Sequence, residues 1–203
     1  MNSATQRLAV AGAAGRIECA LDIPTAASRG LAVLCHPHPQ HGGTMDNKVV
    51  QTMARAFVQL GYRALRFNFR GVGASQGVWD NGIGEIDDAL AVIHAQRSAG
   101  EALVLGGFSF GGYVASNAAQ RLADSAPAER LVLMAPAVKN FVMAAVPADT
   151  LIVHGETDDV VPLADLLEWA RAPVMPVTVV PGSGHFFHGQ LPLLKQIIVN
   201  AWR

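Results

Sequence analysis

Short apolar runs rich in branched residues alternate along this chain with longer segments in which apolar residues recur in a helical period. Such runs predict buried strands, and such segments predict helices with one buried face. From about residue 30 onward the predicted strands are 31–35, 64–69, 103–106, 131–134, 151–153 and 177–180, and the predicted helices are 46–60, 85–95, one after Gly112, 163–170 and 191–202. Because this alternation implies right-handed crossovers, we expect a mostly parallel sheet with helices on both faces.

Two further strand-like runs, 7–11 and 16–23, precede this alternation, and Gly12-Ala13-Ala14-Gly15 separates them. A short connection with glycines is typical of a tight turn between antiparallel strands. No linker, internal repeat or low-complexity tract interrupts the chain. The sequence therefore predicts one α/β domain over residues 1–203, with an N-terminal antiparallel hairpin.

Composition supports burial on both sides of the sheet and narrows the range of partners. Hydrophobic residues make up 51% of the 203 residues and charged residues only 15%, as in a parallel sheet covered by helices. The net charge of −1 gives no basic surplus that would favour nucleic acid or an anionic membrane. Cys19 and Cys35 lie in apolar runs and are too few for a disulfide framework, so we expect free, buried thiols. The chain begins without a leader pattern and has no apolar stretch of about 18 residues, so we expect a cytoplasmic protein.

The segment Gly107-Phe108-Ser109-Phe110-Gly111 lies between a predicted strand and a predicted helix. It fits the Gly-x-Ser-x-Gly nucleophile elbow, in which glycines two residues before and after the serine relieve crowding in a strained turn. Such a turn would lift the Ser109 hydroxyl above the carboxyl edge of a parallel sheet. A tight turn without chemistry is the alternative interpretation of the same five residues.

Reactive side chains gather where the predicted parallel strands end, which is where ligands bind in sheets of this class. The exits of the last two strands carry Asp158 and His185. A serine hydroxyl is a poor nucleophile near neutral pH, so it needs a base within hydrogen-bond reach and an acid that orients the base. The chain order Ser109, Asp158, His185 is the order that accompanies the elbow motif, and it predicts a catalytic triad.

These motifs resemble those of the α/β-hydrolase superfamily, and the resemblance covers nearly the whole chain. The segments that carry it are 107–111, Gly155-Glu156-Thr157-Asp158-Asp159-Val160-Val161-Pro162 and Gly184-His185. More narrowly, the chain is similar to a compact bacterial hydrolase group related to dienelactone hydrolases, through His36-Pro37-His38-Pro39, Gly42-Gly43-Thr44-Met45-Asp46-Asn47-Lys48, Arg66-Phe67-Asn68-Phe69-Arg70-Gly71-Val72-Gly73 and Ser183-Gly184-His185-Phe186-Phe187-His188. The resemblance implies a three-layer α/β-hydrolase fold with a mostly parallel, eight-stranded sheet. Dienelactone hydrolases use a cysteine nucleophile, whereas this elbow has Ser109, so ester chemistry is implied more strongly than hydrolysis of that lactone.

Asp158 and His185 each have a neighbour of the same type. In the resembling family the acid stands three residues after the glycine of a Gly-x-x-Asp-x-x-Val-Pro turn, which selects Asp158 rather than Asp159. Pro162 supports the same register, because proline favours the first position of a helix. His185 is preferred to His188 as the base because it comes directly at the end of the last strand, whereas His188 lies about one helical turn further on.

The backbone amides of His38 and Phe110 are the predicted donors to an oxyanion. Phe110 follows the nucleophile, and within 36–39 the two prolines lack an N–H, so only His38 can donate beyond the strand end. His36, His38 and His41 could instead converge on a metal ion. The intervening prolines restrict that convergence, and we expect no metal; loop packing is the alternative role for His36 and His41.

Arg70, Phe108 and Phe186 are the candidates for contact with substrate. Arg70 at the exit of the 64–69 strand could meet an anionic group, or it could brace the neighbouring loops through hydrogen bonds to carbonyl groups. The two phenylalanines could line an acyl or alcohol pocket or belong to the core. The 135–150 connection is too short for a helical lid, so we expect an open site that suits short-chain or small aromatic esters.

The sequence thus predicts a cofactor-independent serine hydrolase that cleaves small carboxylic esters, or thioesters, through an acyl-enzyme intermediate. Three alternatives stay open: a non-catalytic binding module with this fold, a metal-dependent enzyme and a nicotinamide-dependent enzyme. The nearest dinucleotide motif is Gly71-Val72-Gly73-Ala74-Ser75-Gln76-Gly77, but its third glycine falls one residue late. The expected partner is a small-molecule ester, and we expect no binding to nucleic acid or membrane. The oligomeric state, monomer or homodimer, stays open.

Overall fold

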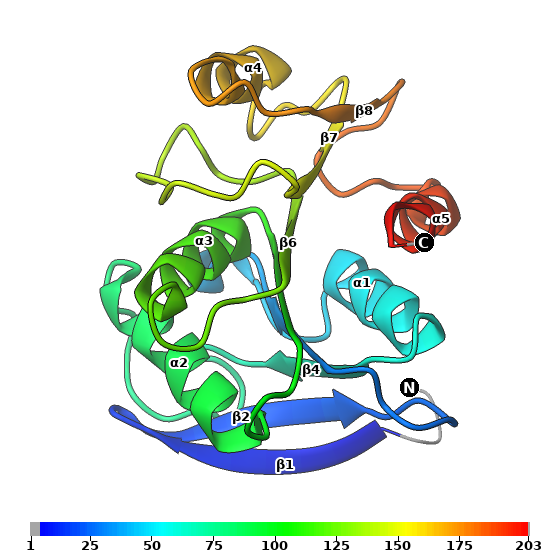
Figure 1. Cartoon of the computed structure of the whole chain (residues 1–203). Coiled ribbons are helices and arrows are strands. Elements are labelled where there is room, and N and C mark those ends of the chain that lie inside the picture. Colours follow the sequence, from blue (N-terminus) through cyan, green and yellow to red (C-terminus); the bar gives the residue numbers. More distant parts are fainter. Residues whose placement is uncertain (1–4, 203) are drawn as a thin grey trace.

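The computed structural model describes residues 5–202, and within them one eight-stranded sheet is flanked by helices (Figure 1). The strands are β1 (Thr5–Gly12), β2 (Gly15–Asp22), β3 (Leu31–Cys35), β4 (Arg63–Phe67), β5 (Leu103–Phe108), β6 (Arg130–Met134), β7 (Leu151–Gly155) and β8 (Thr178–Val180). The helices are α1 (Lys48–Gln59), α2 (Ile83–Gln96), α3 (Phe110–Leu122), α4 (Leu163–Arg171) and α5 (Leu191–Ala201), with a short 3₁₀ helix at Pro39–His41. The predicted α/β architecture is confirmed, and the element boundaries differ from the predicted ones mostly by one or two residues.

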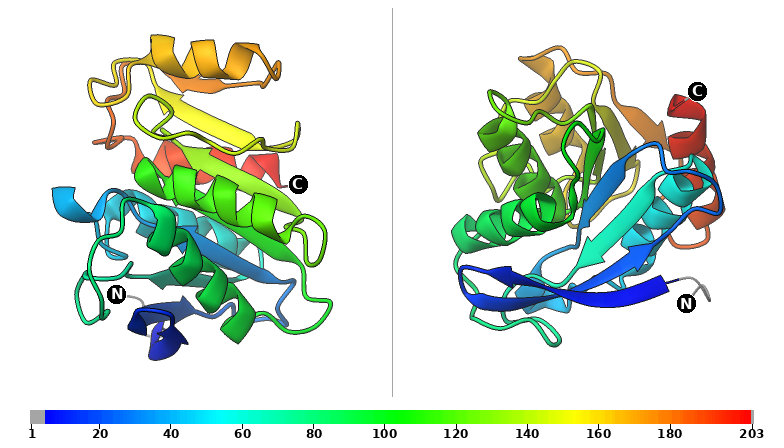
Figure 2. Two further views of the ribbon diagram at one scale, coloured as in Figure 1. Left: turned by 90° about the vertical axis from the view of Figure 1, so that its left-hand side faces the viewer. Right: turned by 60° about the horizontal axis from the view of Figure 1, so that its bottom comes forward.

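The strands follow the order β1-β2-β4-β3-β5-β6-β7-β8 across the sheet. The N-terminal pair β1–β2 is antiparallel, as predicted, and β2 also runs antiparallel to β4. From β4 to β8 every neighbouring pair is parallel. Figure 2 shows the long hairpin crossing one edge of the twisted sheet. The parallel strands therefore all point their carboxyl ends at one edge, where their exit loops meet.

Helices cover the sheet on both faces, which gives three layers (Figures 1 and 2). One apolar core lies under α1 and α5 and includes Phe57 and Ile198. The other lies under α2, α3 and α4 and includes Val114 and Leu166. Strand β5 lies between the two cores, and all six of its residues are buried. A strand packed on both faces is a rigid support for the turn that follows it.

The connection between β6 and β7, residues 135–150, contains no helix. As expected from its length, it forms no lid over the carboxyl edge of the sheet. Cys19 and Cys35 are buried and free, as predicted. None of the helices within residues 5–202 is long and apolar enough to cross a membrane.

Candidate active site

Ser109 occupies a strained turn between β5 and α3. Its backbone angles are φ 55° and ψ −119°, a combination that non-glycine residues rarely adopt and that is concentrated at functional sites. Backbone hydrogen bonds hold this geometry, because the Ser109 N–H donates to the Met134 carbonyl (2.9 Å) and the Ser109 carbonyl accepts from Gly112 (2.9 Å) and Ala137 (3.2 Å). The chain therefore changes from strand to helix at the serine itself.

Gly107 and Gly111 make room for this turn. A Cβ atom on Gly107 would lie 2.0 Å from the carbonyl oxygen of Gly111, and one on Gly111 would lie 2.2 Å from the carbonyl oxygen of Cys35. Only glycine fits at such distances. The second contact brings the end of β3 against the first turn of α3, so the loop that contains His38 lies beside Ser109.

The backbone amides of His38 and Phe110 have no hydrogen-bond acceptor within residues 5–202. Phe110 is the first residue of α3, and the first N–H groups of a helix have no partner inside it. The His38 and Phe110 rings lie 5.2 Å apart between centroids, so the two residues are neighbours across the β3–α3 contact. Free N–H groups at the positive end of a helix are suited to a developing oxyanion. Their role as oxyanion donors stays a prediction.

Asp158 and His185, from the loops after β7 and β8, are joined by a hydrogen bond. His185 Nδ1 lies 2.7 Å from Asp158 Oδ2, and both side chains are buried. The other carboxylate oxygen, Oδ1, accepts from the backbone N–H groups of Val160 (3.0 Å) and Val161 (2.8 Å). An ionised carboxylate can only accept hydrogen bonds, so Nδ1 carries the proton and the Nε2 lone pair is left to accept another.

Asp158 stays ionised although it is buried. Burial acts to raise the pKa of this carboxyl group, but the hydrogen bonds from His185 and Val161 outweigh it and lower the pKa below its usual value. An ionised acid in this position favours a proton on Nδ1 of His185. It also stabilises the imidazolium that would form if Nε2 took a proton.

The loop after β8 holds His185 beside the elbow. Phe187 anchors this loop with a fully buried ring, and the His185 ring packs against the ring of Phe108 at 4.9 Å between centroids. Phe108 directly precedes Ser109 in the chain. Among the described residues the Ser109 hydroxyl makes no hydrogen bond to His185, and catalytic hydrogen bonds often tighten only in the complex with substrate. The structure thus joins Asp158 to His185 and sets the imidazole next to the serine turn.

Asp159 and His188, the neighbours of the same type, point elsewhere. Both residues are exposed. The His188 ring stacks on Phe186 with centroids 5.8 Å apart. The geometry therefore favours Asp158 and His185 within each pair.

His154 on β7 contacts Asp158 and was not singled out from the sequence. Its ring is fully buried, with Nε2 2.8 Å from the Val161 carbonyl oxygen and 3.5 Å from Asp158 Oδ2. Burial lowers the pKa of His154, so the ring is neutral and carries its proton on Nε2. Because Val161 in turn donates to Asp158, His154 helps to fix the carboxylate that orients His185. A histidine directly before the Gly-x-x-Asp turn was the available sequence signal.

Arg70 is held by carboxylates. Its guanidinium lies 2.8 Å (Nη2) and 3.1 Å (Nε) from the Asp88 oxygens, and its backbone N–H donates to Asp88 at 2.9 Å. Asp80 lies 3.7 Å from Nη1. The hydrogen bonds to Asp88 raise the pKa of Arg70 further. These contacts favour the bracing role over contact with substrate, although the sequence suggested loop carbonyls as the partners and the structure shows a carboxylate of α2.

An open cavity of about 680 Å³ lies beside the elbow, on the side of His38. Its lining is aromatic and amide in character and consists of His38, Gln40, Trp79, Asn81, Tyr113, Asn117, Asn140, Phe141 and Val142. The buried Phe110 ring packs against four of the lining rings, with centroid distances between 5.0 and 5.7 Å. The cavity is therefore built directly on the residue that follows Ser109.

Phe108 and Phe186, two of the predicted substrate contacts, lie outside this lining. Phe108 is fully buried under His185, and Phe186 is 45% exposed at the edge of the same ring. Tyr113 and Asn117 were missed, although they follow Ser109 by four and eight residues. That spacing places them along one face of α3, above the turn.

His36 and His41 do not form a metal site with His38. His36 is buried, its Nδ1 donates to the Pro37 carbonyl (2.6 Å) and its Nε2 accepts from the Phe69 N–H (3.1 Å). Burial lowers the pKa of His36 to about 4, so this ring is a neutral link between the exits of β3 and β4. His41 packs on the His38 ring at 4.6 Å. Across residues 5–202, no group of three or more potential ligands is arranged to hold a metal ion.

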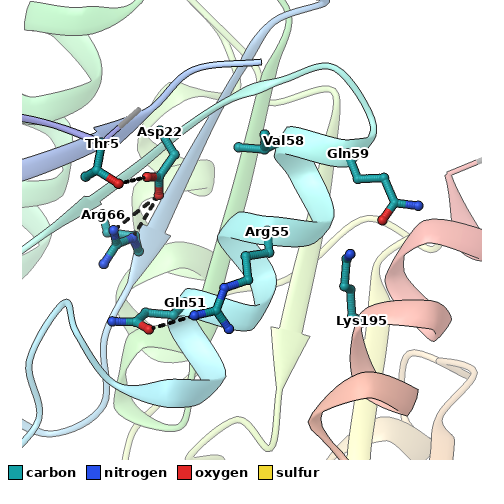
Figure 3. Close-up of a pocket in the computed structure, with 8 residues that line it drawn as sticks. All are labelled: Thr5, Asp22, Gln51, Arg55, Val58, Gln59, Arg66 and Lys195. Atoms are coloured by element: carbon teal, nitrogen blue, oxygen red, sulfur yellow. Dashed lines mark hydrogen bonds and ion pairs between the residues drawn. The ribbon is translucent and has the colours of Figure 1, made fainter. Parts of the chain in front are cut away.

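A second cavity, of about 280 Å³, lies near the hairpin on the face covered by α1 and α5 (Figure 3). It is lined by Thr5, Asp22, Gln51, Arg55, Val58, Gln59, Arg66 and Lys195. Arg66 is neutralised by Asp22 (3.2 Å) and Asp46 (3.0 Å). None of the lining residues belongs to the exit loops that carry Ser109 and His185, so this cavity is separate from the candidate active site.

Comparison with known proteins places the chain in a family. Residues 27–144, which include Ser109, match the family described as serine aminopeptidase, S33. The chain is 37% identical to an α/β serine hydrolase homologue from Coxiella burnetii, with a TM-score of 0.86 and 96% of each chain covered. It is 36% identical to a lidless α/β serine hydrolase from Xanthomonas campestris, with a TM-score of 0.88, 99% of this chain covered and 94% of the other. It is also 32% identical to an uncharacterized protein of Rickettsia prowazekii, over 87% of this chain and 79% of the relative. These similarities show that the chain belongs to the α/β serine hydrolases, in the family described as serine aminopeptidase, S33.

Proposed function

We propose that this protein is a serine esterase that hydrolyses small carboxylic esters through an acyl-enzyme intermediate. Ser109 is the nucleophile, His185 the general base, and Asp158 the acid that orients it. The amides of His38 and Phe110 stabilise the oxyanion. The observation that carries the proposal is the hydrogen bond between ionised Asp158 and His185 Nδ1 (2.7 Å), next to a serine in a strained turn.

The reaction proceeds in two acyl transfers. The Ser109 oxygen attacks the ester carbonyl while its proton passes to Nε2 of His185, and the carbonyl oxygen becomes an oxyanion facing the two amides. The C–O bond to the alcohol then breaks, and the alcohol leaves with the proton from Nε2. In the second transfer, water gives a proton to Nε2 of His185 and attacks the acyl carbon. The bond between the acyl carbon and the Ser109 oxygen then breaks, Ser109 takes the proton back from His185, and the carboxylic acid is released. Thioesters follow the same steps with sulfur as the leaving atom.

Ester hydrolysis suits this site better than removal of an N-terminal amino acid. An aminopeptidase must hold a charged α-amino group, for which a carboxylate is the natural partner. No carboxylate is among the residues that line the cavity beside Ser109. The 135–150 connection forms no helical lid over the carboxyl edge, so small esters can reach the site directly.

Labelling with a fluorophosphonate probe, combined with hydrolysis of p-nitrophenyl acetate, tests this proposal. We expect the wild type to be labelled and active, and Ser109→Ala to be unlabelled with kcat lower by roughly 10⁴ to 10⁶. Ser125→Ala removes an exposed serine from the turn after α3 and serves as the matched control, with labelling and rate unchanged. Labelling of the Ser109→Ala protein at the wild-type level would overturn the proposal. Faster cleavage of aminoacyl p-nitroanilides than of esters would overturn the choice of substrate.

A further inference from the structure

We propose that the cavity beside Ser109, here called the acyl cavity, receives the acyl group of the ester and selects uncharged aromatic acyl groups that carry a hydrogen-bonding ring substituent. The acyl cavity is the one lined by His38, Gln40, Trp79, Asn81, Tyr113, Asn117, Asn140, Phe141 and Val142. This inference rests on the proposed function and names its substrate class.

The position of His185 decides which arm of the ester enters the acyl cavity. In the sheet, β3 and β4 lie on one side of β5, whereas β8 lies at the far end of the other side. His38 and Trp79 follow β3 and β4, and His185 follows β8. The alcohol must leave beside the imidazole that protonates it. The acyl group then extends the other way, past the His38 and Phe110 amides and into the acyl cavity.

Four of the nine residues that line the acyl cavity carry aromatic rings. The His38 and Trp79 rings lie 4.5 Å apart, and the Tyr113 and Phe141 rings 4.9 Å apart, between centroids. The Phe110 ring packs against all four of these rings. Rings that are mutually packed have fixed orientations, so they offer preformed faces and edges to another ring. A flat aryl group fits such walls better than a flexible alkyl chain does.

Four of the polar side chains that line the acyl cavity are amides, which favour neutral substituents. Gln40, Asn81, Asn117 and Asn140 line it, and the lining contains no Asp, Glu, Lys or Arg. Burial and the neighbouring His41 lower the pKa of His38, which favours its neutral form. An amide both donates and accepts hydrogen bonds, so it can satisfy a hydroxyl or carbamoyl group on the ring. A carboxylate would lose its hydration without gaining a charged partner.

A series of p-nitrophenyl esters that share one leaving group tests this selectivity. The acyl groups are acetyl, benzoyl, 4-carbamoylbenzoyl and 4-carboxybenzoyl, and each kcat/KM is divided by the rate of hydrolysis by hydroxide to remove intrinsic reactivity. We expect the benzoyl ester to exceed the acetyl ester by about tenfold or more. The 4-carbamoyl ester should exceed the nearly isosteric 4-carboxy ester by at least about tenfold. A flat profile across the four esters would overturn the inference while leaving the esterase function intact.

Phe141 provides the matched variants, because it lies in the 135–150 loop and contributes one wall. Phe141→Ala should lower kcat/KM for the benzoyl ester by about tenfold and change that for the acetyl ester by less than about threefold. Phe141→Leu should give the same pattern with better retention of packing, and Asn200→Ala on the exposed side of α5 should leave both esters unchanged. All the esters carry the same p-nitrophenyl alcohol, so a loss of similar size with the acetyl and the benzoyl ester would show that the cavity binds the alcohol and would overturn the assignment. Inactivity of the wild type on every ester, without fluorophosphonate labelling, would instead end the proposed function.

Discussion

Replacing Asp158 by asparagine changes one oxygen of the carboxylate to an NH₂ group and little else. The direction in which the new amide points follows from the structure. Val160 and Val161 both direct N–H groups at the Oδ1 position (3.0 and 2.8 Å), so the asparagine oxygen must stay there and its NH₂ must face His185. A donor facing Nδ1 forces the imidazole proton to Nε2. In that tautomer His185 has no lone pair available for the Ser109 proton.

The expected loss in kcat for Asp158→Asn is on the order of 10⁴, as found when the same change imposes the wrong tautomer in a Ser-His-Asp site, and it corresponds to about 5 kcal/mol of transition-state stabilisation. The fold should survive, because the two amide bonds to Oδ1 are retained. We expect the melting temperature to fall by no more than about 5 °C, which is about 1–2 kcal/mol for a chain of this size.

Asp159→Asn is the matched control, since it makes the same chemical change on the adjacent, exposed residue. We expect it to lower kcat by less than about tenfold. Initial rates with p-nitrophenyl acetate give kcat for both variants, and circular dichroism gives their melting temperatures. Equal small losses from both substitutions would show that neither carboxylate orients the base. A larger loss from Asp159→Asn than from Asp158→Asn would reverse the assignment.

His185→Ala should abolish esterase activity and His188→Ala should retain most of it, as measured by kcat on one ester; the opposite result would make His188 the base. Burial holds the pKa of His36 near 4 in the folded protein, whereas a histidine in the unfolded chain has a pKa of about 6.5. Between about pH 6.5 and pH 4 the unfolded chain therefore binds more protons, and the free energy of unfolding falls as the pH decreases. Urea titrations should therefore show the wild type losing about 2 kcal/mol more than His36→Gln between pH 7 and pH 5; equal losses would refute this. Gly111→Ala would place a Cβ 2.2 Å from the Cys35 carbonyl oxygen and should lower the free energy of unfolding by at least about 2 kcal/mol. An unchanged melting temperature would contradict that contact.

The fold class and the serine turn could be read from the sequence because local patterns specify both. Alternating apolar runs and helical periods predicted a mostly parallel sheet, and the structure confirms it. The elbow is equally local: Gly107 and Gly111 flank Ser109, and the crowding they relieve arises within a few residues of the turn. Steric restrictions on a short stretch of backbone leave few conformations. Such a motif therefore predicts nearly the same turn wherever a strand precedes it and a helix follows.

The proximity of Asp158 and His185 could be anticipated, but its details could not. Parallel strands deliver their exit loops to one edge, and the resemblance to α/β hydrolases selected these two residues among several candidates. The sequence did not show that two valine amides would bind one oxygen of Asp158 and leave the other for His185. Nor did it show His154 packed against the same carboxylate.

Only the tertiary structure decided which distant segments meet around the serine. It paired Arg70 with Asp88 of α2, although many acceptors in the loops were compatible with an arginine at that strand exit. It also assembled the acyl cavity from the exits of β3, β4 and β6 together with α3. These contacts depend on the strand order β4-β3-β5-β6 and on the paths of the crossovers. Apolar and polar periodicity determines which face of each element is buried, but a ring or an amide at a strand exit is compatible with many neighbours, and only the packing of the whole chain selects one set.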